Sequence, residues 1–167
     1  MVFLSTVRMR YSDHVRRFKA RATSLAEQGD SDGELRNLLH ALHVSDGSDH
    51  EVLYDLGARS HELDRTDEAI AWYERAEALH PSDPLLLSNL GAAYLMDGRY
   101  RLAFRCFRTA LALDPHDVNA MLNSLELLGA VGRTSGCKAM LAAAPEGVRK
   151  HPQIRELAAE YEMKIES

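Results

Sequence analysis

The residues that could bind a metal ion are few and widely spaced. His40 and His43 lie three residues apart, on what would be one face of a helix, and His50 follows them. Two histidines at this spacing can bind zinc, but a zinc site needs further ligands, and no cysteine lies nearby. We therefore interpret these histidines as residues of a solvated helix end, and we expect no metal ion.

The cysteines and aspartates form no catalytic pattern either. Cys106 and Cys137 belong to no CxxC motif, and both are interpreted as small packing residues. The aspartates between residues 30 and 49 lack the ligand pattern of a calcium loop. There is no glycine-rich phosphate loop and no nucleophile elbow. The sequence thus predicts a protein that is not an enzyme and that uses no cofactor.

The sequence contains an internal repeat with a period of 34 residues. Gly57 and Gly91 are 34 residues apart, and other residues match at the same offset. The matching pairs are Leu53 and Leu87, Leu56 and Leu90, Ala69 and Ala103, Tyr73 and Phe107, Ala76 and Ala110, and Pro81 and Pro115. An internal period of this size is typical of a solenoid built from stacked structural units.

Each unit is predicted to contain two helices. Apolar residues recur at three- and four-residue spacings, which is the pattern of amphipathic helices. In the unit around Gly91, Asp97 and Gly98 are expected to end the first helix, and Pro115 the second. We expect Gly91 to face Ala103, because two helices approach closely only where their side chains are small.

This ladder of small, aromatic and proline residues resembles the tetratricopeptide repeat (TPR) family. The family's unit has Leu-Gly, tyrosine, alanine, an aromatic residue, alanine and proline at these steps. The match is nearly full in residues 84–117 and strong in 50–83, where Ser60 replaces the tyrosine. The resemblance implies an all-α fold, a right-handed superhelical solenoid of helix-turn-helix units.

Weaker copies of the pattern flank these two units. In the earlier copy, Glu34 stands where the family has a small residue. The expected organisation is a basic N-terminal extension (1–14), a degenerate first repeat (15–49), two full repeats (50–83 and 84–117), a degenerate fourth repeat (118–150) and a C-terminal capping helix (151–167).

Charge is distributed unevenly along the chain. The formal net charge is −5, yet the first 22 residues carry six basic side chains and only one acidic one. This basic segment could be a targeting signal, a helix docked on its own array, or a contact between two copies of the chain. Few aromatic residues interleave with its basic ones, so nucleic-acid binding is not expected. The unpaired cysteines favour the cytoplasm, and no apolar run is long enough to span a membrane.

The resemblance also implies where a partner would bind. In TPR proteins the first helices of successive units line a concave groove. Positions on these helices outside the ladder give the predicted groove residues: Tyr54, Asp55 and His61; Leu85, Asn89, Leu95 and Met96; and Asn119, Leu122, Asn123 and Glu126.

Family members that bind the acidic tails of heat-shock chaperones do so with a carboxylate clamp of lysine, asparagine and arginine. Lys19 matches that clamp, but Asp55 and Leu85 do not. Binding of those tails is therefore not expected.

The predicted function is that of a cytoplasmic adaptor or scaffold that binds a peptide or an amphipathic helix of a partner protein in the groove. Leu85, Leu95 and Met96 would be exposed apolar contacts, unless packing between repeats or the N-terminal segment covers them. Two alternatives remain: a chaperone similar to those of type III secretion, which shields an apolar partner, and a regulatory subunit of an enzyme complex.

Overall fold

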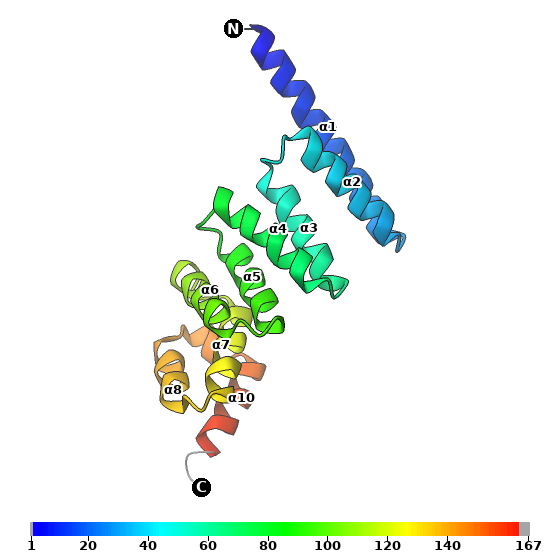
Figure 1. Ribbon diagram of the computed structural model, residues 1–167. Helices are drawn as coiled ribbons and strands as arrows, with labels where there is room; N and C mark the ends of the chain where they lie inside the picture. The colour runs from blue at the N-terminus through cyan, green and yellow to red at the C-terminus, as the bar shows by residue number, and fades with distance from the viewer. Residues whose placement is uncertain (1, 164–167) are drawn as a thin grey trace. The chain divides into compact units, whose positions relative to one another are not determined.

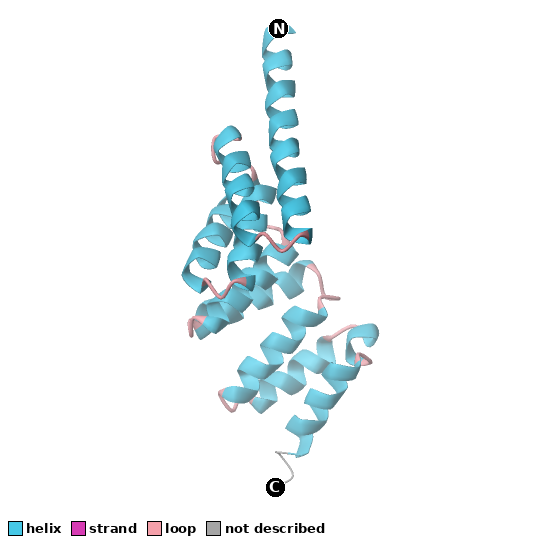
Figure 2. Cartoon of the chain, turned by 90° about the vertical axis from the view of Figure 1, so that its right-hand side faces the viewer, coloured by secondary structure: helices cyan, strands magenta, loops and turns pink. Residues whose placement is uncertain are grey.

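The structure is a computed structural model that describes the backbone of residues 2–163 and the side chains of residues 12–160. All regular secondary structure in the described residues is helical (Figures 1 and 2). The helices are α1 (Val2–Glu27), α2 (Ser31–Val44), α3 (His50–Glu62), α4 (Thr66–Leu79), α5 (Pro84–Met96), α6 (Tyr100–Leu113), α7 (Val118–Ala130), α8 (Thr134–Ala143), α9 (Glu146–Arg149) and α10 (Pro152–Met163). The predicted all-α class is confirmed.

The chain forms two compact units, Met1–Pro81 and Ser82–Ser167. In the first unit, α1 packs against α2 and α3 packs against α4, so each pair is a helical hairpin. Asp30 caps α2 by accepting a hydrogen bond from the Gly33 amide, and Asp49 caps α3 by accepting one from the Val52 amide. Such caps satisfy amide groups that a helix start leaves without partners.

Helix α1 is much longer than its partner. It has 26 residues and α2 has 14, so α1 extends about 18 Å further. Figure 1 shows α1 running beyond the end of α2. The helix continues without a break across the predicted boundary between residues 14 and 15. Val15 and Ala22 are buried in the α1–α2 hairpin.

In the second unit, α5 and α6 form a hairpin, α6 also packs on α7, and α8 and α10 pack on α7. Helix α5 ends at Met96, and Gly98 follows it with a φ of +77°, a left-handed conformation that glycine adopts without strain. The predicted helix end at Asp97 and Gly98 is therefore confirmed. Asp83 caps the start of α5 through the amides of Leu85 and Leu86.

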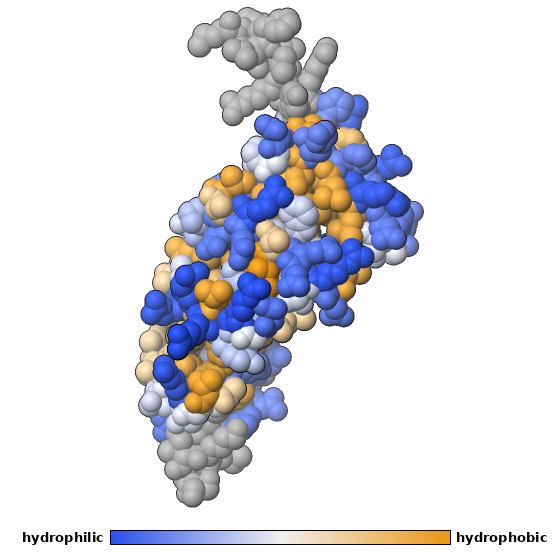
Figure 3. All heavy atoms as spheres, viewed as in Figure 1, coloured by the Kyte–Doolittle hydropathy of each residue, from blue (hydrophilic) through white to orange (hydrophobic). Residues whose placement is uncertain are grey.

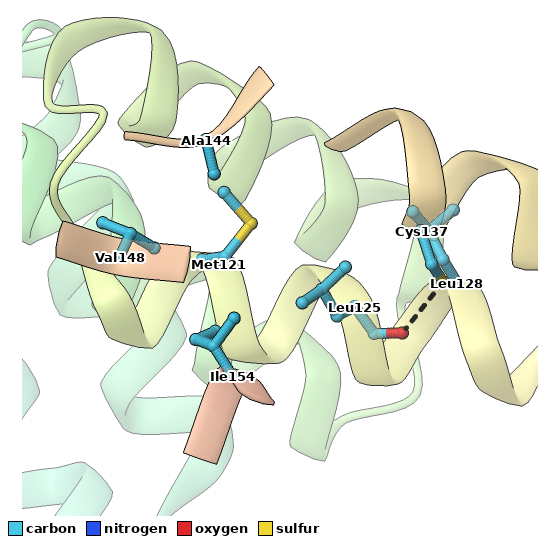
Figure 4. Close-up of a cluster of buried hydrophobic side chains, with 7 residues drawn as sticks. All are labelled: Met121, Leu125, Leu128, Cys137, Ala144, Val148 and Ile154. Carbon is cyan, nitrogen blue, oxygen red and sulfur yellow. Dashed lines mark hydrogen bonds between the residues drawn. The ribbon is translucent and has the colours of Figure 1, made fainter. Parts of the chain in front are cut away.

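The C-terminal helices close over one apolar cluster (Figure 4). Its buried members are Met121, Leu125, Leu128, Cys137, Ala144, Val148 and Ile154. They come from α7, α8, α9, α10 and the segment joining α8 to α9. The predicted capping helix thus contributes Ile154 to this core; residues 164–167 of its predicted range lie outside the described residues.

The equivalent glycines lie under aromatic rings. A Cβ atom on Gly91 would come within 2.6 Å of the Phe107 ring, and one on Gly57 within 2.6 Å of the Tyr73 ring. The atoms nearest to this added Cβ of Gly91 belong to the aromatic residue of the second helix, Phe107. The missing side chain makes room for a flat ring, and the ring fills the space between the two helices.

Within the part of the chain that the structure describes, no helix combines the length and the apolar composition needed to cross a membrane.

Candidate partner-binding surfaces

Three of the predicted groove residues lie on α3 in the first unit. Tyr54, Asp55 and His61 are all half-buried. The Tyr54 ring lies 5.9 Å from the Tyr73 ring, centroid to centroid, so it packs partly against the hairpin's own core. Asp55 also forms an ion pair within the unit. Two of the three residues, Tyr54 and Asp55, therefore already have contacts inside the unit.

The cation in that pair is Lys19 of α1. Its Nζ atom lies 2.8 Å from Glu51 Oε2 and 3.5 Å from Asp55 Oδ2, so one lysine joins α1 to two carboxylates of α3. A lysine already paired in this way is a poor receptor for a partner's carboxylate. That the chain does not bind acidic tails through a clamp stays a prediction.

The pKa values of this cluster follow from burial and charge. Burial by itself would lower the pKa of Lys19. The hydrogen bond to Glu51 and the nearby carboxylates act in the opposite direction and together outweigh burial, so the pKa is raised. The same hydrogen bond lowers the pKa of Glu51. Asp55 is more enclosed, and its burial raises its pKa even though Lys19 acts in the opposite direction.

A second ion pair joins α2 to α3. Arg59 Nε lies 2.9 Å from Glu34 Oε2, and another guanidinium nitrogen lies 2.7 Å from Glu62 Oε2. Glu34 was noted in the sequence because a small residue is usual at its position. Its charge is accommodated by Arg59, a partner that the sequence pattern did not indicate. Burial raises the pKa of Glu34, and Arg59 lowers it in part.

These residues line a depression of about 230 Å³ between α1, α2 and α3. Lys19, Arg59, Glu34, Asp55 and Glu62 all contribute to its walls. The charged residues that line this depression are therefore of both signs.

The second unit presents a different surface on α5. Leu85 is 58% exposed and Met96 is 54% exposed, whereas Leu95 is half-buried. Leu86, Leu87 and Leu90 are buried on the opposite side of the same helix. Helix α5 is thus apolar on its outer face as well as its inner one, which is unusual for a helix at a protein surface.

The three predicted apolar contacts do not form one cluster. Leu85 lies in the first turn of α5 and Met96 is its last residue, so about 16 Å of helix separates them. Figure 3 likewise shows apolar residues reaching the surface in several separate places among charged ones.

The remaining predicted groove residues belong to α5 and α7. Asn89 is half-buried on α5. On α7, which packs against α5, Asn119 and Glu126 are exposed, and Leu122 and Asn123 are half-buried.

The structure brings two of the predicted residues together. Leu95 of α5 and Glu126 of α7 line one depression of about 360 Å³. Four further residues of this depression, all apolar or aromatic, were not predicted from the sequence: Tyr100, Leu127, Ala130 and Val131. Tyr100 begins α6 and Val131 lies in the turn after α7, so neither occupies a first-helix position facing the predicted groove.

The histidines considered as metal ligands and the cysteine considered as a nucleophile pack against other side chains. The His40 ring stacks on Phe18 at 5.4 Å, and the His50 ring stacks on His80 at 3.8 Å. Within residues 12–160, no three histidine, cysteine or carboxylate side chains gather in a way that could hold a metal ion. Cys137 lies in the apolar core, where burial raises its pKa and so disfavours the reactive thiolate.

This chain consists of paired helices, and two of the pairs repeat the same glycine–aromatic contact. These features place it in the class of helical-repeat proteins. Family models agree with this class. One described as "TPR repeat" matches residues 57–98, and one described as "Tetratricopeptide repeat" matches residues 84–117. Residues 57–117 thus carry repeats of the tetratricopeptide repeat family.

Solved structures of low sequence identity share the fold. A tetratricopeptide repeat protein from Parabacteroides merdae is 18% identical with a TM-score of 0.82; the likeness covers 90% of this chain and 59% of that one. The MamA protein is 17% identical with a TM-score of 0.75, covering 93% and 90%. An O-GlcNAc transferase from Thermobaculum terrenum is 23% identical with a TM-score of 0.64, covering 71% and 23%.

Among curated proteins, the chain is similar to the human protein O-mannosyl-transferase TMTC1. The two are 32% identical over 92 residues, which is 54% of this chain and 10% of the transferase. The chain therefore spans about a tenth of the length of this relative.

Proposed function

We propose that the chain is an adaptor or scaffold that binds a peptide or an amphipathic helix of another protein along the first helices of its repeats. The observation that carries this proposal is the outer face of α5. Leu85 and Met96 are both more than half exposed there, and exposed apolar side chains usually mark a contact site. Recognition of a segment in a helix-lined groove needs such apolar anchors at separated positions.

Polar residues on α7 fit the same role. Asn119 and Asn123 are one helical turn apart, and a side-chain amide can both donate to and accept from a peptide backbone. We propose that the apolar anchors of the partner lie along α5 and that its backbone meets these amides. In the first unit, Lys19 is held by Glu51 and Asp55, so the partner's contacts there are with a surface of mixed charge.

We propose that the chain binds and does not itself catalyse, and that it requires no cofactor. Two proteins similar to it are named as transferases, and this favours one alternative, that of a regulatory subunit of an enzyme complex. A shielding chaperone is less well supported, because such a protein needs a continuous apolar surface and Leu85 and Met96 lie at opposite ends of α5.

The proposal includes a cytoplasmic location. Both cysteines are buried, and Cys137 is a free thiol, which suits a reducing compartment.

The test is affinity capture from the extract of the native cell. Wild type is compared with a Leu85→Glu/Met96→Glu variant and with a Leu79→Glu/Leu113→Glu control. The control leucines have similar exposure, 43% and 46%, but lie at the ends of the second helices α4 and α6. Circular dichroism establishes that all three proteins are folded.

We expect the α5 variant to lose at least about 90% of a specific partner, because each glutamate places a charge where an apolar contact forms. The control should retain that partner. Equal capture by the α5 variant and wild type would refute binding at this face, and loss in the control alone would move the contact to the second helices.

A further inference from the structure

A second apolar depression lies where α6 begins and α7 ends. Tyr100 and Phe104 of α6 face Leu127 and Leu128 of α7, and Val131 of the following turn closes one side. The depression has a volume of about 320 Å³. We name it the edge hollow, because it is formed by helix ends and a turn. It shares Tyr100, Leu127 and Val131 with the depression that Leu95 and Glu126 line, but neither of these two predicted groove residues lines the edge hollow itself.

The apolar lining of the edge hollow is open to solvent. Tyr100 is 55% exposed and Val131 is 56% exposed, although both are large apolar or aromatic residues. Tyrosine is enriched at the centres of protein interfaces, where its ring supplies contact area with little loss of conformational entropy. The exposure of two such residues beside one depression is the first observation that points to a ligand.

The second observation is the charge at the rim. Arg101 and Arg133 both line the edge hollow and are exposed, and neither forms an ion pair among the described residues. Helix α6 contains no aspartate or glutamate, so no carboxylate on that helix offsets Arg101. Arg99 is nearby but different, since it pairs with Asp97 and lies over the Tyr94 ring.

We propose that the edge hollow binds a short acidic segment of a partner protein that carries one large apolar side chain. The apolar side chain enters the hollow between Tyr100 and Val131. Carboxylates on either side of it meet Arg101 and Arg133, because a guanidinium binds a carboxylate through two parallel hydrogen bonds. An apolar centre with a charged rim is the usual arrangement of a protein contact site.

Charge complementarity selects this occupant over others. A basic segment, such as the N-terminal part of a second copy of this chain, would be repelled by the two arginines. An uncharged apolar segment would leave the same two cations without partners at the rim. Nucleic acid would use the arginines but gain little from an aliphatic wall of Leu127, Leu128 and Val131.

The test begins with a library of random twelve-residue peptides displayed on phage and selected on the full chain. We expect the enriched peptides to share one large apolar residue flanked by aspartate or glutamate. The best of them, made synthetically with a fluorescent label, is then titrated by fluorescence anisotropy against wild type and variants.

Two variants address the two halves of the proposal. An Arg101→Glu/Arg133→Glu variant reverses the rim charge, and Val131→Glu places a carboxylate in the mouth of the hollow. Both changes are at exposed positions, and circular dichroism checks the folds. We expect each to weaken peptide binding about tenfold or more, and we expect wild-type binding to weaken as salt rises.

Arg105→Glu/Arg108→Glu is the matched control, because it makes the same charge change on α6 with arginines that do not line the hollow. It should change the affinity less than about threefold, which is the scale of an exposed charge effect. The Leu85→Glu/Met96→Glu variant should also retain binding, so failure of the edge hollow and failure of the α5 groove are distinguishable.

Three results would overturn the proposal. The selection could enrich no acidic peptide, the rim variant could bind as well as wild type, or the control could lose binding equally. Peptides lost only by the α5 variant would support the proposed groove and refute the edge hollow.

Discussion

Single residues set the spacing within each hairpin. Gly57 and Gly91 have no side chain, and the fully buried rings of Tyr73 and Phe107 occupy the space that a side chain would take. The same contact recurs in both repeats, so the internal period reflects one packing solution used twice. Ser60 departs from the pattern: it is fully buried, and its hydroxyl has no hydrogen-bond partner among the described residues.

The substitution Gly91→Ala should destabilise the protein. The new Cβ would lie 2.6 Å from the Phe107 ring, so the two helices or the ring must move apart. Overpacking of this kind typically costs about 1–3 kcal/mol. The measurement is the midpoint of urea unfolding followed by circular dichroism.

Gly147→Ala provides the control, because nothing lies within 4 Å of the Cβ that it would add. Its midpoint should equal that of wild type or exceed it slightly. If Gly91→Ala unfolds at the same urea concentration as Gly147→Ala, the glycine–ring contact does not limit helix spacing.

Neighbouring hairpins of the first unit are joined by charged residues as well as by apolar packing. Lys19 joins α1 to α3, and Arg59 joins α3 to α2. Because Glu51 has a lowered pKa in the folded protein, its ion pair stabilises the fold at neutral pH. That contribution is lost as the pH falls through the lowered value. Asp55 has a raised pKa, so its ionisation opposes folding at neutral pH, and this cost disappears on acidification.

A Lys19→Met variant should raise the pKa values of both Glu51 and Asp55, because it removes the cation that lowers them. Carboxyl carbon shifts followed by NMR during a pH titration measure this directly. The variant should be less stable than wild type at pH 7 by up to about 1 kcal/mol, since the pair is partly exposed. The difference should shrink as the pH falls and both carboxylates become protonated.

Arg16→Met is the matched control. Arg16 lies on the same helix, but among residues 12–160 its one ion pair is with exposed Asp13, at 3.8 Å, so its removal should leave both pKa values in place. Unchanged carboxyl titrations in Lys19→Met would contradict the ion pairs described for α1 and α3.

At the scale of the whole molecule, each compact unit has its own core. Val15, Ala22 and Leu38 are buried in the first unit, and Leu125 and Ile154 in the second. Helix α1 extends beyond α2, and its N-terminal part carries much of the basic charge. We propose that this part of α1 contacts a second copy of the chain, one of the alternatives that the sequence left open.

Deleting residues 1–11 should therefore reduce the number of copies in each particle in solution and leave the fold intact. Val15 and the rest of the described core are retained, so we expect the melting temperature of the truncated monomer to change by less than about 5 °C. Analytical ultracentrifugation measures the mass. The same number of copies per particle in the full and truncated proteins would refute the contact between copies.

Much of the fold followed from local sequence. The glycine, aromatic and proline positions predicted the paired helices, and Asp97 with Gly98 predicted the end of α5, since helix periodicity and helix ends depend on residues close in sequence. The exposure of Leu85 and Met96 was also expected, because both lie outside the ladder. The groove as a binding site remains a prediction.

Contacts between separate helices depended on the tertiary structure. The pairing of Glu34 with Arg59 joins residues that share no periodic pattern. The edge hollow unites Tyr100 at a helix start with Val131 in a turn and Arg133 beyond it. Periodicity assigns each residue to a face of its own helix, but the distance between two helix ends is set by how their buried side chains pack. Sequence therefore determined the repeating helix pairs, and packing between the pairs decided which surface residues came together.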